Sequence, residues 1–297
     1  MNKYLFFFLV FFSFALFATP ENDFLRANLN GDYDKVVELY EKEGLRLTYA
    51  RDKDGNTPLH IACCSKKGGS KAKVVAFLID KGVNVNAQNK YDSTPLFIAV
   101  SNGNYEATKL LLSAKGIRVN QTYQQSFTPL HVAVISQTPP LIELLLSHPD
   151  INPNFGTTDG ATPLHYAAMQ GLVEEAKILI DHLSTDVNAP QHDAIYSGAT
   201  PLHFAAMQAQ TEIVSYLLSN PKIQVNAAIN QGSQTGFTPL HYAVLNPDTV
   251  NVLEVVNLLL DHGANPNIKC EGGKTPSELT AVSIIQKALA NHKKKRK

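Results

Sequence analysis

A four-residue motif, Thr-Pro-Leu-His, recurs along this 297-residue chain at nearly regular spacing. The intact copies are Thr57–His60, Thr128–His131, Thr162–His165, Thr200–His203 and Thr238–His241. Two altered copies, Thr94–Phe97 and Thr275–Glu278, extend the series, and successive threonines are 37, 34, 34, 38, 38 and 37 residues apart. Such a period is typical of a protein built from stacked structural units, so the repeat constrains the fold more than the chain length does.

Each copy of the motif predicts the start of a helix. A threonine can cap the first helical turn through its hydroxyl group, and proline fits the first helical position because its missing N–H costs nothing there. In the third intact copy, residues 165–171 predict a short helix that ends in a glycine, and residues 174–180 carry apolar side chains at helical spacing. An asparagine-containing stretch, residues 186–188, then ends the second helix.

Further residues around the motif resemble the ankyrin repeat family. Asp54-Gly55 and Asp159-Gly160 precede two copies, and Leu258-Leu259-Leu260-Asp261-His262-Gly263-Ala264-Asn265 closes another unit. The resemblance covers about residues 22–290. It implies an all-α fold, an ankyrin-repeat solenoid of about eight helix-turn-helix units joined by β-hairpin-like finger loops. It also implies that the motif histidines are structural and bond to the neighbouring backbone.

The repeat divides the chain into five parts. Residues 20–51 are expected to form a degenerate N-terminal capping repeat, with helices over residues 23–27 and 35–40. Regular repeats are expected over residues 52–271, and a C-terminal capping repeat over 272–292 with its second helix at 282–290. The outermost units of a stack are atypical because one face meets water. A signal peptide (residues 1–18) and a basic tail (residues 293–297) complete the chain.

The first eighteen residues have the layout of a secretory signal peptide. Lys3 precedes an apolar run over residues 5–17, and small residues follow at Ala15 and Ala18. We expect cleavage after Ala18, with Ala15 as the alternative, and export to the periplasm or the medium. The other interpretation is a membrane anchor formed by residues 5–17, although that run is shorter than the ~20 residues that span a bilayer.

Composition and charge argue against several classes of function. When Lys3 and the five basic residues of 293–297 are set aside, 20 basic residues remain against 26 acidic ones. A body with this balance is not expected to bind nucleic acid broadly. The three cysteines, Cys63, Cys64 and Cys270, do not form a disulfide framework, and no Cys/His group has zinc spacing. We find no catalytic motif and therefore expect no enzymatic activity, no cofactor and no small-molecule substrate.

The resemblance implies that a protein partner binds the concave surface formed by the fingers and the first helices. The exposed positions would follow the motif, and they include an apolar series with neighbouring amides: Ile135, Met169, Gln170, Met207, Gln208 and Leu245. Tyr123 and Tyr196 are the preferred aromatic contacts on the fingers. The alternative is that these side chains pack between repeats.

Three functions remain open. The leading one is an exported, monomeric scaffold that binds a protein. A second is a secreted effector that acts in a host cell, where the basic tail could direct it to the nucleus. A third is a periplasmic regulator or inhibitor of an enzyme, which differs from the first only in the identity of the partner.

Overall fold

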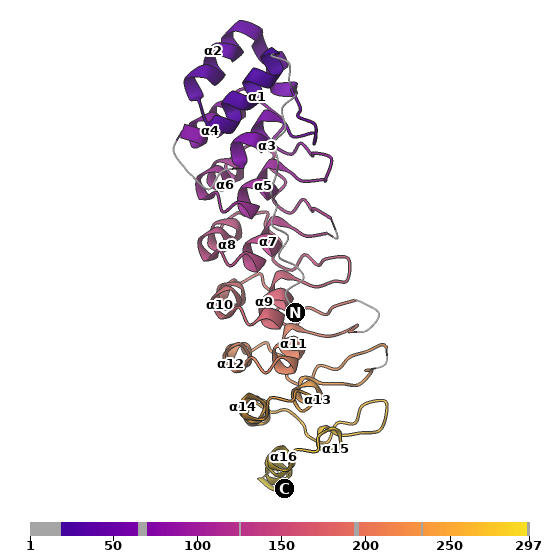
Figure 1. Cartoon of the computed structure of the whole chain (residues 1–297). Coiled ribbons are helices and arrows are strands. Elements are labelled where there is room, and N and C mark those ends of the chain that lie inside the picture. The colour runs from indigo at the N-terminus through magenta and orange to yellow at the C-terminus, as the bar shows by residue number, and fades with distance from the viewer. Residues whose placement is uncertain (1–18, 65–69, 125, 193–195, 233, 296–297) are drawn as a thin grey trace. The chain divides into compact units, whose positions relative to one another are not determined.

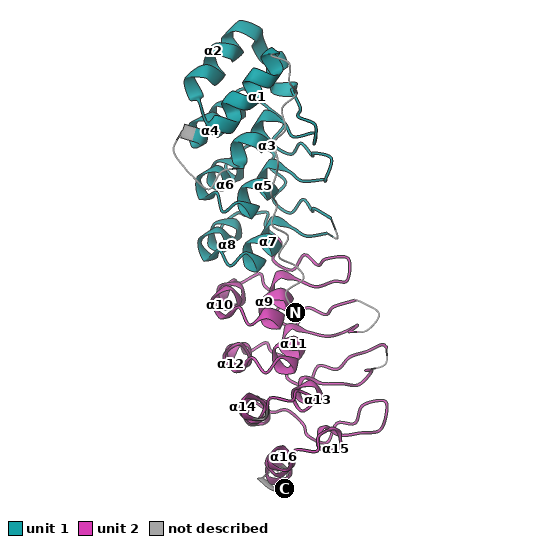
Figure 2. Ribbon diagram, in the orientation of Figure 1, with its two compact units in different colours: residues 1–151 teal, residues 152–297 magenta. Residues whose placement is uncertain are grey.

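The computed structural model describes residues 19–64, 70–124, 126–192, 196–232 and 234–295. The chain divides into two compact units, residues 1–151 and residues 152–297 (Figure 2). The signal segment, most of the lysine-containing insertion after Cys64 and the last two residues of the basic tail lie outside the described residues.

Unit 1 contains four helix pairs and one short 3-10 helix. They are α1 (Pro20–Asn30), α2 (Tyr33–Glu43), η1 (Gly44–Tyr49), α3 (Pro58–Cys63), α4 (Ser70–Asp80), α5 (Pro95–Ser101), α6 (Tyr105–Leu112), α7 (Pro129–Ile135) and α8 (Pro139–Leu146). From α1 to α7, the first helix of each pair packs on the first helix of the next, and the second helices α2 to α8 do the same (Figure 1).

Unit 2 repeats this arrangement with four further pairs. They are α9 (Pro163–Gln170), α10 (Val173–Asp181), α11 (Pro201–Met207), α12 (Thr211–Ser219), α13 (Pro239–Ala243), α14 (Thr249–Asp261), α15 (Pro276–Leu279) and α16 (Ser283–Lys295). The described residues thus form eight helix pairs and no strand, which confirms the predicted all-α class. No described helix is both long enough and apolar enough to span a bilayer.

The core of each unit is built from the motif leucine and the alanines of the first helices. Leu59, Leu96 and Leu130 in unit 1 are fully buried, as are Leu164 and Leu202 in unit 2. The alanine three residues after each of these leucines is also fully buried, and its small side chain lets neighbouring first helices approach closely.

The two end units differ in detail from the sequence expectation. Helix α1 begins at Pro20 rather than near residue 23, because the Thr19 hydroxyl accepts a hydrogen bond from the Asn22 amide and caps it. The first unit therefore keeps the Thr-Pro start and lacks only Leu-His. At the other end, α16 continues to Lys295, five residues beyond the expected end at 290.

The fingers are turns that join one helix pair to the next. Adjacent fingers are linked by backbone hydrogen bonds: in unit 1 the Lys90 amide donates to the Asp54 carbonyl at 2.9 Å, and in unit 2 the His192 amide donates to the Asp159 carbonyl at 2.9 Å. Among the described residues, the strand-like pairing of the fingers amounts to one isolated bridge, Tyr123 with Phe127. Side chains add to these backbone bonds, since Asn89 Nδ2 in unit 1 donates to Asn56 Oδ1 of the preceding finger at 2.7 Å.

Candidate protein-binding surface

The motif histidine caps its own helix. In unit 2 the Thr162 backbone N–H donates to His165 Nδ1 at 3.1 Å, and the Thr162 hydroxyl donates to the same atom at 2.9 Å. The same pair of bonds forms within Thr57–His60, Thr128–His131, Thr200–His203 and Thr238–His241. Since Nδ1 accepts in every copy, the ring proton is on Nε2.

The Nε2 atom of the motif histidine links each repeat to the next repeat along the chain. His60 Nε2 donates to the Ser93 carbonyl at 2.9 Å, and in unit 2 His165 Nε2 donates to the Ala199 carbonyl at 3.2 Å. His203 and His241 make the corresponding bonds to the carbonyls of Phe237 and Lys274, both at 3.3 Å. Each acceptor is the residue just before the next motif threonine, so one imidazole stabilises a helix start and the finger that follows.

Burial keeps these imidazoles neutral. His60 and His165 are almost completely excluded from solvent, and burial lowers the pKa of His60, His165 and His203 to about 4. Burial also lowers the pKa of His241. Each of these rings is thus neutral and hydrogen-bonded at both nitrogens, which supports the structural role expected of a residue that recurs once per repeat.

Removal of the threonine hydroxyl should weaken the cap. We expect Thr162→Ala and Thr200→Ala each to lower the free energy of unfolding by ~1 kcal/mol, because each change deletes the hydroxyl bond to Nδ1 while the backbone N–H bond remains. Urea unfolding followed by circular dichroism measures the loss. Pro163→Ala is the comparison and should cost less, and an unchanged stability in both threonine variants would contradict the capping role.

Phe97 replaces the histidine in one unit and makes a different contact. The Phe97 ring is buried and stacks on Tyr123 of the next finger, with ring centroids 4.4 Å apart and planes at 29°. The Thr94 hydroxyl still accepts from the Phe97 amide at 3.2 Å, so the helix start is retained. Tyr123, predicted as a partner contact, is therefore half-buried against the preceding repeat.

The predicted apolar series of unit 2 lies at the ends of adjacent first helices. Asn246 Nδ2 donates to the Met207 carbonyl at 2.8 Å, which places the end of α11 beside the turn after α13. A Cβ atom added to Gly171, just after α9, would lie 2.6 Å from the side chain of Gln210, which places the end of α9 beside the turn between α11 and α12. The chain segments that carry Met169, Met207 and Leu245 therefore lie side by side.

We call Met169, Gln170, Met207, Gln208 and Leu245 the first-helix surface of unit 2. Its two methionines are half-buried, its two glutamines are exposed, and Leu245 is 47% exposed. The two methionines are thus partly packed and still reach solvent, and a partner contact at these residues stays a prediction. Ile135 is also half-buried and ends α7 in unit 1.

Tyr196 is more strongly packed than the sequence suggested. Its ring lies edge-on to Phe204, with centroids 5.5 Å apart, and 6.5 Å from the ring of Tyr242. The tyrosine is half-buried, and the two rings it contacts are buried. Replacement of Tyr196 would therefore disturb the finger as well as any partner contact.

A second set of inter-repeat bonds was missed by the sequence reasoning. In unit 2, Asn154 Nδ2 donates to the Ser184 carbonyl at 2.7 Å, and Asn154 Oδ1 accepts from the Asp186 amide at 2.6 Å. Asn188 makes the same two bonds one repeat later, and Asn226 makes them two repeats later. The signal was present as an Asn two residues before each finger, but we interpreted it only as a helix breaker.

The adjacent cysteines, Cys63 and Cys64, are protonated thiols. Burial raises the pKa of Cys64 to about 12 and that of Cys63 well above its usual value, so both thiols are protonated and poorly nucleophilic. Cys63 is fully buried in α3. Within the described ranges, no group of three His, Cys, Asp or Glu side chains could hold a metal ion.

Comparison with known proteins agrees with this geometry. A family model described as ankyrin repeats (3 copies) matches residues 24–123, 116–191 and 187–270. A transient receptor potential cation channel subfamily A member 1 homolog from Caenorhabditis elegans is 34% identical over 88 residues, which are 30% of this chain and 7% of that protein. Ankyrin repeat protein R664 of Acanthamoeba polyphaga mimivirus is 33% identical over 77 residues, 26% of this chain and 48% of that protein.

A solved structure shows the same fold over a longer stretch. The ankyrin repeat domain of Bcl-3, an IkappaB family member, is 25% identical and superposes with a TM-score of 0.69, covering 80% of this chain and all of that domain. The chain spans less than half the length of the two curated relatives, so their own activities are not carried over. Ankyrin repeats generally mediate protein–protein interaction and form a scaffold without catalytic activity. The repeated helix pairs, their histidine-linked fingers and the matched family model together show that this chain belongs to the ankyrin repeat family.

Proposed function

We propose that this protein is an exported, non-enzymatic scaffold that binds a protein partner through the first-helix surface of unit 2. The observation that carries the proposal is the chemistry of that surface. From Thr162 to Gln170, from Thr200 to Gln208 and from Thr238 to Asn246 the chain contains no charged residue. Partly exposed methionines and an exposed leucine therefore lie on adjacent helix ends with amides beside them.

Such a surface suits a protein contact. Burial of Met169, Met207 and Leu245 on binding would be favourable, because these stretches contain no charged side chain that would have to be dehydrated. Methionine side chains adapt to irregular partner surfaces. Gln170 and Gln208 are exposed and can hydrogen-bond to a partner backbone at the edge of the contact.

Export rests on the sequence of residues 1–18. Cleavage after Ala18 or after Ala15 would both leave Thr19 in the mature chain, and Thr19 is the residue that caps α1. The structured part of the protein is therefore compatible with removal of the signal segment at either position. The effector and enzyme-regulator alternatives share this export step and differ in the partner that is bound.

The test is affinity capture from the exported fraction with wild-type protein and with Met169→Ser combined with Met207→Ser. The double variant is expected to lose its partner or to bind it at least tenfold more weakly, since central apolar contacts dominate interface energies. Amino-terminal sequencing of the exported protein should give Thr19 as the first residue. Tyr196 is left unchanged because its ring packs on Phe204.

Leu183→Ser is the matched control. Leu183 is 95% exposed in the loop after α10 and lies outside the first-helix surface, so its replacement removes apolar area without touching the proposed contact. A partner that binds the double variant as tightly as wild type would exclude the first-helix surface. Circular dichroism melting of each variant shows that the fold is retained.

A further inference from the structure

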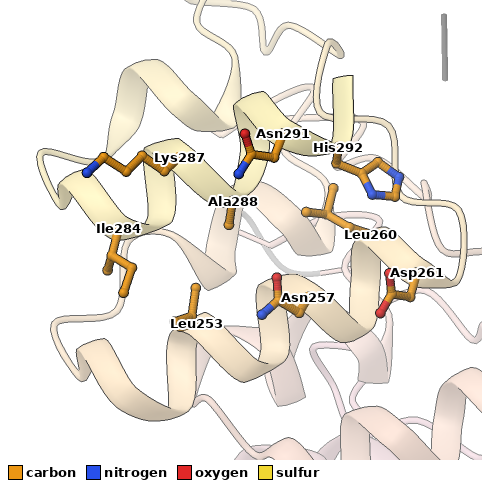
Figure 3. Close-up of a pocket in the computed structure, with 9 residues that line it drawn as sticks. All are labelled: Leu253, Asn257, Leu260, Asp261, Ile284, Lys287, Ala288, Asn291 and His292. Atoms are coloured by element: carbon orange, nitrogen blue, oxygen red, sulfur yellow. The ribbon is translucent and has the colours of Figure 1, made fainter. Parts of the chain in front are cut away.

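Unit 2 has a hollow between its last two second helices, away from the first-helix surface residues. Its volume is about 330 Å³, a size at the small end of known ligand pockets. The side chains that line it come from α14 and α16: Leu253, Asn257, Leu260, Asp261, Ile284, Lys287, Ala288, Asn291 and His292. Ala288 lies at its middle, and Asp261 and His292 lie together at one end (Figure 3).

The hollow exists because Ala288 occupies a position that holds a larger side chain in preceding units. The second helices share a pair of fully buried residues four apart, which are Ile213 and Leu217 in α12, Val255 and Leu259 in α14, and Ile285 and Leu289 in α16. The residue just before the second member of each pair is Tyr216, Leu258 and Ala288 in turn. An alanine at this position leaves space that a tyrosine fills between α10 and α12.

Tyr216 shows what fills this position in the same unit. Its hydroxyl lies 2.8 and 2.9 Å from the two carboxylate oxygens of Asp181, the last residue of α10, and donates to that carboxylate. The Lys177 ammonium group lies 5.6 Å from the centre of the Tyr216 ring. The ring is half-buried between the two helices.

The α14–α16 hollow has a carboxylate at the position equivalent to Asp181, but it has no aromatic ring at the position equivalent to Tyr216. Asp261 ends α14 as Asp181 ends α10, and Asn257 precedes Asp261 by four residues as Lys177 precedes Asp181. The hollow is lined by both Asp261 and Asn257. At the same end, the Nε2 atom of His292 is buried and has no hydrogen-bond partner among the described residues. The Asp261 carboxylate and His292 Nε2 would both be available to a hydroxyl group that entered the hollow.

We propose that the α14–α16 hollow binds a tyrosine side chain supplied by a protein partner, in the place that Tyr216 occupies between α10 and α12. Leu253, Leu260 and Ile284 would contact the ring, and Asp261 would accept the hydroxyl proton in a hydrogen bond. Tyrosine is a frequent anchor at protein interfaces because it combines a large apolar ring with one polar atom. The first-helix surface is not involved, so this proposal and the proposed function can fail separately.

The probe is N-acetyl-tyrosine amide, titrated into the isotope-labelled mature chain and followed by NMR. We expect saturable shifts confined to α14 and α16, with a dissociation constant on the order of millimolar for so small a ligand. N-acetyl-phenylalanine amide should bind at least threefold more weakly, because it cannot donate to Asp261. Equal binding of the two amides would overturn the role of Asp261. Binding of p-cresol without binding of the tyrosine amide would overturn a side chain as the occupant.

Four variants complete the test. Ala288→Tyr copies Tyr216 and Ala288→Leu copies Leu258, so each should fill the hollow and abolish the shifts, and either one suffices if the other fails to fold. Asp261→Ala should lower the affinity for N-acetyl-tyrosine amide to the affinity for N-acetyl-phenylalanine amide. Tyr216→Ala should create a second binding position beside Asp181. Shifts that persist in both filled variants, or a Tyr216→Ala protein that gains no binding, would overturn the proposal.

Discussion

Lowering the pH from 7 to 5 should reduce the free energy of unfolding by about 2 kcal/mol for each of His60, His165 and His203. In the folded protein, burial lowers the pKa of these side chains to about 4. In the unfolded chain the same residues titrate near the ordinary histidine value of about 6.5. One unit of pKa difference corresponds to about 1.4 kcal/mol, so the full effect is about 3 kcal/mol for each residue when pH 4 is reached.

The direction follows from which state binds more protons. Between about pH 6.5 and pH 4 the unfolded chain binds protons at these histidines and the folded protein does not, so stability falls as the pH falls through this window. Above the unfolded pKa the stabilisation is fully present, and below the folded pKa these groups cause no further loss. The cause is burial, which penalises the charged form of the ring. A protonated ring would also lose the threonine N–H bond that Nδ1 accepts.

Urea unfolding at pH 7, 6 and 5 measures the effect above the range in which most carboxylates titrate. His165→Gln combined with His203→Gln is the matched variant, because an amide oxygen can accept the threonine N–H without titrating. Glu278 shows that an acyclic side chain fits this position, since its Oε2 atom accepts from the Thr275 amide at 2.7 Å. The variant should lose most of the pH dependence of unit 2, and an equally steep dependence would contradict the assignment.

Gly160→Ala should destabilise unit 2 by about 3 kcal/mol. Gly160 has φ +79°, which an alanine adopts only with strain. A Cβ atom there would also lie 2.8 Å from the backbone nitrogen of His192, the atom that donates to the Asp159 carbonyl and links two fingers. The substitution therefore adds backbone strain and breaks the bond between neighbouring fingers.

Gly273→Ala separates these two causes. Gly273 has φ +73° in the last finger, and an added Cβ atom would meet nothing within 4 Å. Its replacement should cost only the strain of the left-handed conformation, about 1 kcal/mol. The two variants lie in the same unit and are compared by the same urea titration. Equal losses would show that the approach of the His192 backbone has no energetic weight.

The helical framework was predictable because its signals are local. Thr-Pro marks the starts of the first helices, and buried leucines and alanines follow at fixed intervals. The seven copies of the motif and the degenerate first repeat together give the eight helix pairs. The start of α1 could also have been found, since Thr19-Pro20 is the same signal without Leu-His.

The surface was less predictable because its side chains contact residues of neighbouring repeats. Tyr123 and Tyr196 stand at finger positions that the pattern marks as exposed, yet Phe97 of the preceding repeat stacks on Tyr123, and the ring of Tyr242 in the following repeat lies 6.5 Å from that of Tyr196. Those contacts depend on the particular residue that a neighbouring unit carries. The α14–α16 hollow has the same origin, since it depends on an alanine where other units carry larger side chains. A repeat pattern predicts where a residue lies within its repeat, but it does not predict which side chains meet between two particular repeats.

The inter-repeat hydrogen bonds have a consequence for how readily units of this chain can be exchanged. Each acceptor is a backbone carbonyl, and the residues that carry it are Ser93, Ala199, Phe237 and Lys274, which have nothing in common as side chains. A histidine-bearing unit can therefore be followed by a unit of any sequence at that position. Phe97 is different, because it is held by the ring of Tyr123. In a shuffled or extended array, those two residues have to be transferred together.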